Sequence, residues 1–515
     1  MHGAVGPPTG PAASRRRTSR SSDAPGERRA DPEPPTSEAP VTPPHEHAPG
    51  ADEGGGLTGA VVVVALVSAI SGLLYGYDTG IISGALLQIS DEFGIGIGWE
   101  QVIAASILAG AVVGALVCSR LSERRGRRGT LLVVAVVFVV GTLAASLAPD
   151  PVTLAAARLV LGFAVGGATQ TAPVYVAELA PTKYRGRLVL CFQIAIGAGI
   201  LTATIVGASE VVDWRWAIGA AAVPSALMLA LMLRLPESPR WLVRAEQVER
   251  AREALGRVRP RGADVSGELD DIGDRVHAER EASTRGWRGL RAAWVRPALV
   301  VGCGLAVFTQ LSGIEMIVYY SPTILTDNGF PDSTALRVSV ALGATYLVTQ
   351  LIGLAIVDRV GRRRLTLITL PGAALAMAVL GTFFVTGNSG REHVPYIIAT
   401  LVVFMAFTAG GIQLMGWLTG SEIYPLATRA AGAAAQSASL WATNLLITLT
   451  LLSLIDTIGT GQTFWLYAAF NVLAFVFLYL RMPELSGRSL EQVERRLSEG
   501  RFRPADFAED RPGAR

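Results

Sequence analysis

The sequence predicts an all-α membrane protein with twelve transmembrane helices. Of its 515 residues, 50% are hydrophobic and only 17% are charged, whereas soluble chains carry about 25% charged residues. The charges are clustered, and long uncharged stretches lie between the clusters. A helix that faces water shows a polar stripe, which these stretches lack. Lipid is therefore their expected environment, and the Gly and Pro they contain suit helices better than barrel strands.

Twelve apolar stretches reach, or nearly reach, the length of about 20 residues that a helix needs to cross the hydrocarbon core. They lie near residues 58–88, 101–119, 129–149, 151–177, 188–209, 216–233, 297–322, 338–357, 365–387, 394–421, 430–455 and 457–480. Arginines gather in the loops after the second, fourth and eighth stretches, whereas the opposite loops hold few. Since basic loops stay in the cytoplasm, we expect both termini to be cytoplasmic.

Three short elements occur twice in the same order, which indicates an internal repeat. Residues 123–128 return as 358–363, residues 178–185 as 422–429, and residues 236–237 as 483–484. Two parallel six-helix halves around a midplane site are typical of secondary transporters. The predicted domains are a disordered cytoplasmic tail (1–56), an N-terminal half (57–235), a cytoplasmic helical linker (236–296), a C-terminal half (297–482) and a cytoplasmic C-terminal tail (483–515).

Several other kinds of function are disfavoured by the sequence. Lys183 is the only lysine and follows Thr182, so the Gly-Lys pair of a phosphate-binding loop is missing. We therefore expect no ATPase in this chain and no ATPase subunit. No nucleophile–base pair or metal-ligand spacing is found, which predicts neither an enzyme nor a metal or cofactor site. No nucleic-acid partner is expected, and the five histidines all lie outside the apolar stretches.

A set of ordered motifs extends over about residues 60–495. They are Gly-Tyr-Asp-Thr-Gly at 76–80, the two arginine-rich loops, Ala-Glu-Leu-Ala-Pro at 177–181, Pro-Glu-Ser-Pro-Arg-Trp-Leu at 236–242, Gln-Leu-Ser-Gly at 310–313, Tyr-Tyr at 319–320 and Ser-Glu-Ile-Tyr-Pro at 421–425. With these motifs the chain resembles the sugar porter family of the major facilitator superfamily. The resemblance implies alternating access between the halves, a sugar or polyol as substrate, and protons as the coupling ion.

Three charged residues fall within the predicted helices, where charges are costly and often functional: Asp78, Arg158 and Glu315. Glycines recur every four residues in the first helix and suit close helix contact, with Asp78 roughly opposite that ridge. A buried Asp–Arg pair can act as a proton switch, because the carboxylate stays ionised only while its counter-charge is near. The resemblance implies this proton-coupling role for Asp78 and Arg158, and a static structural ion pair is the alternative.

The resemblance also implies a substrate site. Its expected residues are Gln193, Thr309, Gln310, Glu315, Trp417 and Asn444. Glu315 departs from the family, which usually has Asn at this position. A protonated Glu315 could donate to a hydroxyl, whereas an ionised one could receive a cation or serve as a second proton site. Pairing with a neighbouring polar group is the alternative, and we expect Trp417 to stack on substrate and Trp441 to pack.

A third group of charges lies at the predicted cytoplasmic ends of the helices. Its members are Glu123, Arg124, Glu178, Arg185, Glu237, Asp358, Arg359, Glu422 and Arg429. We expect the acids and arginines of the repeated motifs to form salt bridges between the halves that keep the inner side closed. Solvated cytoplasmic charge is the alternative for many of these arginines.

The resulting functional hypothesis is proton-coupled uptake of a sugar, polyol or related small polar solute. The expected partners are this substrate, protons and the lipid bilayer of the plasma (inner) membrane, which the chain would cross many times. Proton-driven export of a specialised metabolite or cationic solute is the alternative, because Glu315 and the apolar Ile200 and Leu440 depart from a sugar-binding pattern. A non-transporting nutrient sensor is a further alternative.

Overall fold

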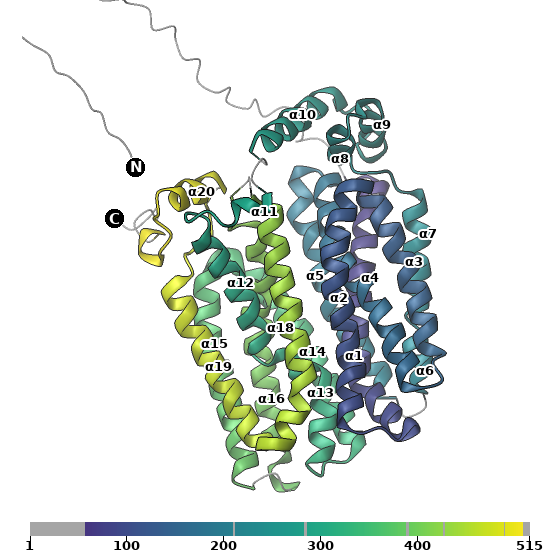
Figure 1. Cartoon of the computed structure of the whole chain (residues 1–515), viewed down its shortest axis with the longest axis vertical. Helices are drawn as coiled ribbons and strands as arrows, with labels where there is room; N and C mark the ends of the chain where they lie inside the picture. The colour runs from purple at the N-terminus through teal and green to yellow at the C-terminus, as the bar shows by residue number, and fades with distance from the viewer. Residues whose placement is uncertain are drawn as a thin grey trace, which may run out of the picture. The chain divides into compact units, whose positions relative to one another are not determined.

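A computed structural model describes residues 57–209, 212–282, 286–387, 391–425, 428–488 and 490–507. Within these ranges the chain is helical and contains no strand. Twelve of the described helical segments are long and apolar enough to cross a bilayer (Figure 1), which confirms the predicted fold class. The tail predicted to be disordered, residues 1–56, lies outside the described residues.

The N-terminal half supplies six spans, and the last of them is divided into two helices. They are α1 (Gly59–Phe93), α2 (Ile97–Arg125), α3 (Arg127–Ser146), α4 (Pro151–Leu179), α5 (Thr182–Gly207), and α6 (Trp214–Gly219) with α7 (Ala222–Arg234). Some helices extend beyond the predicted spans; α2, for example, continues to Arg125 rather than 119. Hydropathy marks only the apolar part of a helix, whereas the helical hydrogen bonds continue into its charged end.

The C-terminal half also supplies six spans. They are α12 (Arg296–Leu311) with α13 (Ile314–Asp327), α14 (Asp332–Val360), α15 (Arg362–Val385), α16 (Val394–Ala409) with α17 (Ile412–Leu418), α18 (Arg429–Ile458) and α19 (Thr460–Arg481). Short helices lie outside the spans: α8 (Pro239–Arg244), α9 (Val248–Val258), α10 (Val265–Ala282) and α11 (Gly286–Gly289) between the halves, and α20 (Leu490–Ser498) and η5 (Pro504–Phe507) after them.

Two C-terminal spans that we expected to be continuous are broken near their middles. Between α12 and α13, Gly313 has φ +95°, a left-handed conformation that strongly favours glycine. Between α16 and α17 the helix is interrupted at Gly410 and Gly411, and a Cβ on Gly411 would collide with the Thr369 hydroxyl. Broken helices free backbone and side-chain polar groups at membrane depth, as is common in transporter binding sites.

Glycine-mediated packing holds the N-terminal half together. The predicted glycine ridge of α1 faces α5, where a Cβ on Gly76 would collide with the carbonyl oxygen of Ile196. Likewise α4 lies against α2, where a Cβ on Gly162 would collide with the carbonyl oxygen of Ile107. Small residues allow this close approach of backbones, which is a main source of helix association in lipid.

Both halves pair their helices in the same way. The α1–α5, α2–α4 and α3–α7 pairs of the first half correspond to α12–α18, α14–α16 and α15–α19 of the second. Three further pairs, α2–α18, α5–α14 and α1–α13, join the halves. Hydrogen bonds between described residues cross this interface, among them Ser453 to Gln101 at 2.9 Å and Gln170 to Ser437 at 2.6 Å. The repeated pairing favours the internal repeat inferred from sequence.

The segment between the halves packs onto one end of the spans, here named the linker end. Helices α8, α9 and α10 share a small apolar core that includes Leu242 and Leu255. Arg259 donates to the carbonyl of Leu179 at 2.8 Å, which fixes this segment to the end of α4. The start of α1 is at the same end, because Thr58 donates to the carbonyl of Val258 at 2.8 Å.

Substitution of Gly162 tests the α2–α4 contact. Gly162→Ala should lower the free energy of unfolding by about 1–3 kcal/mol, because its Cβ forces two backbones apart. Thermal unfolding of the purified protein in detergent measures the effect. Gly256→Ala in α9 is the matched control, since a Cβ there meets nothing within 4 Å. An unchanged unfolding temperature for Gly162→Ala would contradict the close contact.

Candidate functional site

Asp78 of α1 and Arg158 of α4 lie together inside the N-terminal half. Arg158 is fully buried and Asp78 is 6% exposed, and Arg158 Nη1 lies 3.7 Å from Asp78 Oδ1. Arg158 Nε donates to the carbonyl of Ile103 in α2 at 2.9 Å, which holds the guanidinium in place. Its Nη1 and Nη2 have no hydrogen-bond partner among the described residues. The predicted pair is therefore present, with a separation too long for a hydrogen bond.

A small void adjoins Asp78 on the side of α3. Its volume is about 10 Å³, and its lining includes Tyr77, Asp78, Phe138 and Thr142. The buried Thr142 hydroxyl has no hydrogen-bond partner among the described residues, whereas Tyr77 donates to the carbonyl of Ala217 at 2.6 Å. A void of this size is close to the minimum for one water. A water there would lie within the half, beside the carboxylate and the free hydroxyl.

The two helix breaks bring a second buried acid against an amide. Glu315, in the first turn of α13, is 4% exposed. Gln413, in the first turn of α17, donates from Nε2 to Glu315 Oε1 at 3.3 Å. Tyr75 of α1 and Tyr346 of α14 are close enough to interact electrostatically with this carboxylate. Residues of both halves thus surround Glu315.

Several buried amide and indole groups near the middle of the spans have no hydrogen-bond partner among the described residues. These atoms are Gln193 Nε2, both polar atoms of Gln310 and of Gln350, Gln413 Oε1, Trp441 Nε1 and Asn444 Nδ2. Buried polar atoms are normally paired, and an unpaired one costs about 1–3 kcal/mol. The concentration of such atoms indicates a surface that is completed by a polar ligand or by water.

Packing contacts connect these groups. Gln350 lies against Gly197 of α5, one helical turn from Gln193, so both amides lie at the α5–α14 contact. On the other side, the ring of Trp441 makes edge contacts with Tyr75, at 5.4 Å between centroids, and with Trp417, at 6.4 Å. The unpaired indole therefore lies between α1 and α17.

The expected substrate residues differ in how the structure places them. Gln193, Gln310 and Asn444 are buried, and each has at least one amide atom without a hydrogen-bond partner among the described residues. Thr309 differs, since its hydroxyl contacts the carbonyls of Leu305 at 2.8 Å and Ile412 at 3.3 Å and so serves helix packing. Trp417 is half-buried and packs on Trp441.

Sequence reasoning missed Gln350 and Gln413, and it treated Trp441 as packing alone. The glycine pair at 410–411 is a signal that could have drawn attention to Gln413, because a helix break exposes the residues that follow it. Trp441 does pack, but its indole N–H remains unpaired. No local pattern distinguishes Gln350, whose placement depends on contact with the other half.

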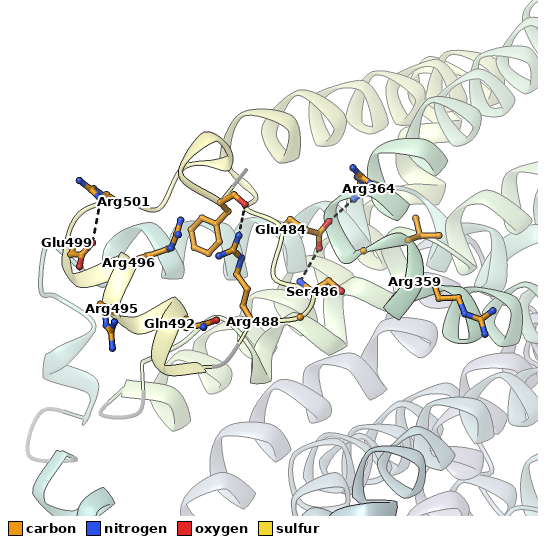
Figure 2. A pocket seen from close by; sticks show the side chains of 14 residues that line it. Arg359, Arg364, Glu484, Ser486, Arg488, Gln492, Arg495, Arg496, Glu499 and Arg501 are labelled. Carbon is orange, nitrogen blue, oxygen red and sulfur yellow. Dashed lines mark hydrogen bonds and ion pairs between the residues drawn. The ribbon is translucent and has the colours of Figure 1, made fainter. Parts of the chain in front are cut away.

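At the linker end, each half holds its charges in the same arrangement. Glu178 accepts from Arg127 Nε at 2.9 Å and Nη2 at 3.0 Å, and Glu422 accepts from Arg362 Nη2 at 3.1 Å. In addition, Glu237 caps α3 by accepting from the Arg127 backbone N–H at 2.8 Å. Glu484 caps α15 in the same way (Figure 2). In each half, one arginine thus contacts two carboxylates, one through its side chain and the other through its backbone N–H, and joins the helix ends.

This arrangement corrects the expected salt bridges between the halves, because Glu178 and Glu422 pair with arginines of their own half. Their partners are Arg127 and Arg362 of the repeated motifs, whereas the candidate gate residues named from these motifs were Arg124 and Arg359. The reason is geometric: Arg127 and Arg362 begin α3 and α15, where their side chains meet the carboxylates.

The remaining predicted gate residues have varied surroundings. Asp358 pairs with Arg362 at 2.8 Å, and Arg429 Nε donates to the carbonyl of Tyr424 at 3.3 Å. The side chains of Glu123 and Arg124 are exposed. Arg185 is partly buried and lies near three other arginines, Arg240, Arg259 and Arg275. The sequence alone did not distinguish the gate residues that form ion pairs from those that are exposed.

Comparison with known proteins identifies the family. The model of the family described as "Sugar (and other) transporter" matches residues 64–497. The chain is 36% identical to a D-xylose transporter of Levilactobacillus brevis, covering 83% of this chain and 93% of that protein. It is 35% identical to the galactose-proton symporter of Escherichia coli strain K12, covering 85% and 94%.

A third relative, the major myo-inositol transporter of Bacillus subtilis, is 34% identical and covers 84% of this chain and 93% of its own length. Among solved structures, the major facilitator proton:xylose symporter XylE bound to 6-bromo-6-deoxy-D-glucose matches with a TM-score of 0.71. That match has 26% identity and covers 85% of this chain and 98% of the other. The chain belongs to the sugar transporter family and has the major facilitator fold.

Proposed function

We propose that this protein is a secondary active transporter that couples the uptake of a sugar, polyol or related small polar solute to the entry of protons. The observation that carries the proposal is the buried Asp78–Arg158 pair, whose charges are 3.7 Å apart inside one half. Relatives that include a galactose-proton symporter and a myo-inositol transporter support the substrate class. Twelve apolar helices and bacterial relatives place the protein in the plasma membrane as a multi-pass protein.

In this proposal the linker end faces the cytoplasm, and both termini lie on that side. The arginine-rich loops that precede α3 and α15 support this orientation. Residues 57–235 and 297–482 move as two halves around the substrate, residues 236–296 link them, and residues 483–515 follow the second half. The Glu178 and Glu422 networks keep the helix ends of each half together while the halves rock.

Asp78 is the proposed proton carrier. When it is ionised, Arg158 neutralises it, and when it is protonated the pair is no longer needed. Tyr319 of α13 lies against Thr79, the neighbour of Asp78. A shift of α13 would therefore change the surroundings of the Asp78 carboxylate. The water-sized void beside Asp78 and Thr142 has room for one water, which can exchange a proton with the carboxylate. Substrate binding near Glu315 and proton binding at Asp78 are thereby linked through α13.

The proposed substrate site comprises Gln193, Gln310, Gln350, Gln413 and Asn444 together with Glu315, which accepts from Gln413. Amide groups suit a polyhydroxylated ring, because each can donate to one hydroxyl and accept from another. The aromatic rings of Trp417 and Trp441 supply an apolar face for the ring carbons. Glu315 favours one alternative, the proton-driven export of a cationic solute, since an ionised carboxylate would attract a positive charge.

Reconstitution into liposomes tests the coupling. Asp78→Asn should abolish accumulation of labelled D-xylose, galactose or myo-inositol under an imposed proton gradient, because an amide cannot carry the proton. Exchange of the same solute down its own gradient should persist. Asp91→Asn is the control, since Asp91 is exposed at the end of α1. Accumulation that survives in Asp78→Asn removes Asp78 from the mechanism.

Arg158→Ala should impair transport more broadly, because it leaves Asp78 buried without its partner. Removal of one member of a buried pair costs about 3–5 kcal/mol. Thermal unfolding of the purified variant measures this loss. The double variant Asp78→Asn with Arg158→Ala should be more stable than Arg158→Ala, because it has no unpaired buried carboxylate. If the double variant is as unstable as Arg158→Ala, the unpaired carboxylate is not the cause of the loss.

The linker-end network has its own test. Glu178→Gln should loosen the linker end of the N-terminal half, because the amide holds Arg127 and Ser238 less strongly. A loosened end should favour inward-open states, since only a few kcal/mol separate them from the resting state. Cysteine labelling from the linker end measures accessibility in a background that lacks Cys118, Cys191 and Cys303. Glu123→Gln serves as the control, because that side chain is exposed. Equal labelling in both variants would leave Glu178 without a gating role.

Glu315→Gln separates the two substrate classes, because Gln has nearly the shape of Glu but cannot ionise. For a neutral sugar, Glu315 acts as a protonated donor, so the variant keeps its affinity and loses pH dependence. For a cationic solute, the variant loses a counter-charge and about 1–3 kcal/mol of binding free energy. Binding is measured at several pH values with the ligand found in the liposome assay. Unchanged affinity together with an unchanged pH profile would exclude Glu315 from binding.

A further inference from the structure

The short helix α17 carries Trp417 and has few hydrogen bonds of its own. It has seven residues, Ile412–Leu418, and continues into the 3-10 helix η3 (Thr419–Ser421). The last four carbonyls of a helix have no partner within it, and a helix of about two turns is not stable alone. The position of Trp417, in the last turn of α17, therefore depends on contacts from outside the helix.

Gln436 of α18 supplies such a contact. It is 4% exposed, and its Nε2 donates to the carbonyl of Gly416, the residue before Trp417, at 2.9 Å. The same nitrogen donates to Thr419 Oγ1 at 3.5 Å, and Oε1 accepts from the Tyr424 hydroxyl at 3.1 Å. The amide thus connects the end of α17 with the tyrosine that follows η3.

Tyr424 is itself held in place, because it fills a slot between α12 and α18. It is buried, and the slot exists only because glycines line it. A Cβ on Gly302 of α12 would collide with the Tyr424 hydroxyl, and a Cβ on Gly432 of α18 would collide with its ring. A ring enclosed in this way cannot turn without moving the helices around it. Its hydroxyl therefore offers Gln436 a fixed partner.

Gln436 differs from the amides of the proposed substrate site. That site includes atoms without a hydrogen-bond partner among the described residues, such as both polar atoms of Gln310, whereas both amide atoms of Gln436 have partners. A carbonyl oxygen can only accept, so the NH2 group of Gln436 must face Gly416, which leaves its oxygen for the Tyr424 hydroxyl. The side chain is thus occupied within the protein and holds α17 rather than a solute.

We propose that Gln436 is a positioning residue that orients the indole of Trp417 through the carbonyl of Gly416. The inference rests on the proposed function, in which Trp417 offers an apolar face to the substrate ring. Trp441 of α18 also packs edge-on against Trp417, at 6.4 Å between ring centroids. Two contacts from one helix therefore define where the Trp417 indole lies. An indole placed before binding loses less conformational entropy when the solute arrives.

Fluorine NMR of the detergent-purified protein, labelled with 5-fluorotryptophan, tests the position of Trp417 without any ligand. The Trp417 resonance is assigned as the one that is missing from Trp417→Phe. Gln436→Met keeps the length of the side chain and removes its amide, so the Trp417 resonance should shift or broaden. Tyr424→Phe removes only the hydroxyl and should move the same resonance, but it should add no further change in the Gln436→Met background.

Thr443→Val is the matched control on α18, because the Thr443 hydroxyl donates to the carbonyl of Ser439 in its own helix at 2.8 Å. This variant should leave the Trp417 resonance in place. An unchanged Trp417 resonance in Gln436→Met, or in Tyr424→Phe if Gln436→Met does not fold, would overturn the proposal. An equal shift in Thr443→Val would overturn it as well.

Transport kinetics in liposomes extend the test to the solute. Gln436→Met should raise the KM for labelled D-xylose, galactose or myo-inositol by about two- to tenfold, the effect of one lost hydrogen bond, with less than about a twofold change in maximal rate. A lower maximal rate at an unchanged KM, with an unmoved resonance, would mean that Gln436 only supports folding and would overturn the proposal. A shifted resonance with unchanged kinetics would confirm the positioning and refute the substrate role of Trp417. The NMR readout needs no ligand, so it decides the positioning even if none of these solutes is transported.

Discussion

A charge inside the membrane must be neutralised by its surroundings. In this protein Asp78 and Arg158 neutralise each other, and the packing of the N-terminal half encloses the pair. In hydrocarbon there is no water to solvate either group, so each stabilises the other. The glycine contacts of α1 with α5 and of α2 with α4 bring the backbones close enough to enclose the pair. Arg158 is also held by the carbonyl of Ile103. Protonation of Asp78 removes the need for the pair and thus changes the forces within the half.

The proposed substrate region follows from the same constraint at the contact of the two halves. Polar groups at membrane depth persist only where they have partners or line a site. The breaks at Gly313 and Gly411 place Glu315 and Gln413 at the starts of two short helices, and these side chains bond to each other. Among the described residues, several nearby amide atoms have no hydrogen-bond partner. A solute with several hydroxyl groups would satisfy them, which connects the geometry to the sugars and polyols of the relatives.

Much of this organisation could be predicted from sequence, and the exceptions have physical causes. Hydropathy gave the twelve spans, because length and lack of charge are properties of single segments. The helix breaks at Gly313 and Gly411 were not predicted, because hydropathy averaged over a span is not sensitive to one left-handed or crowded backbone position. The pairing of Asp78 with Arg158 could be expected from the resemblance to sugar porters, which implies it. Arg127 was not distinguished from Arg124, since only the point where α3 begins decides which side chain reaches Glu178. Gln350 was missed because its position depends on contact with the opposite half.

The central claim is that solute and proton cross the membrane together, with Asp78 as the carrier. The most direct test is to add a transported sugar to wild-type liposomes without an imposed gradient and to record the external pH with an indicator dye. Coupled uptake predicts that the medium becomes more alkaline as the sugar enters, in proportion to the amount of sugar taken up. Entry of the sugar with no change in external pH would contradict the account.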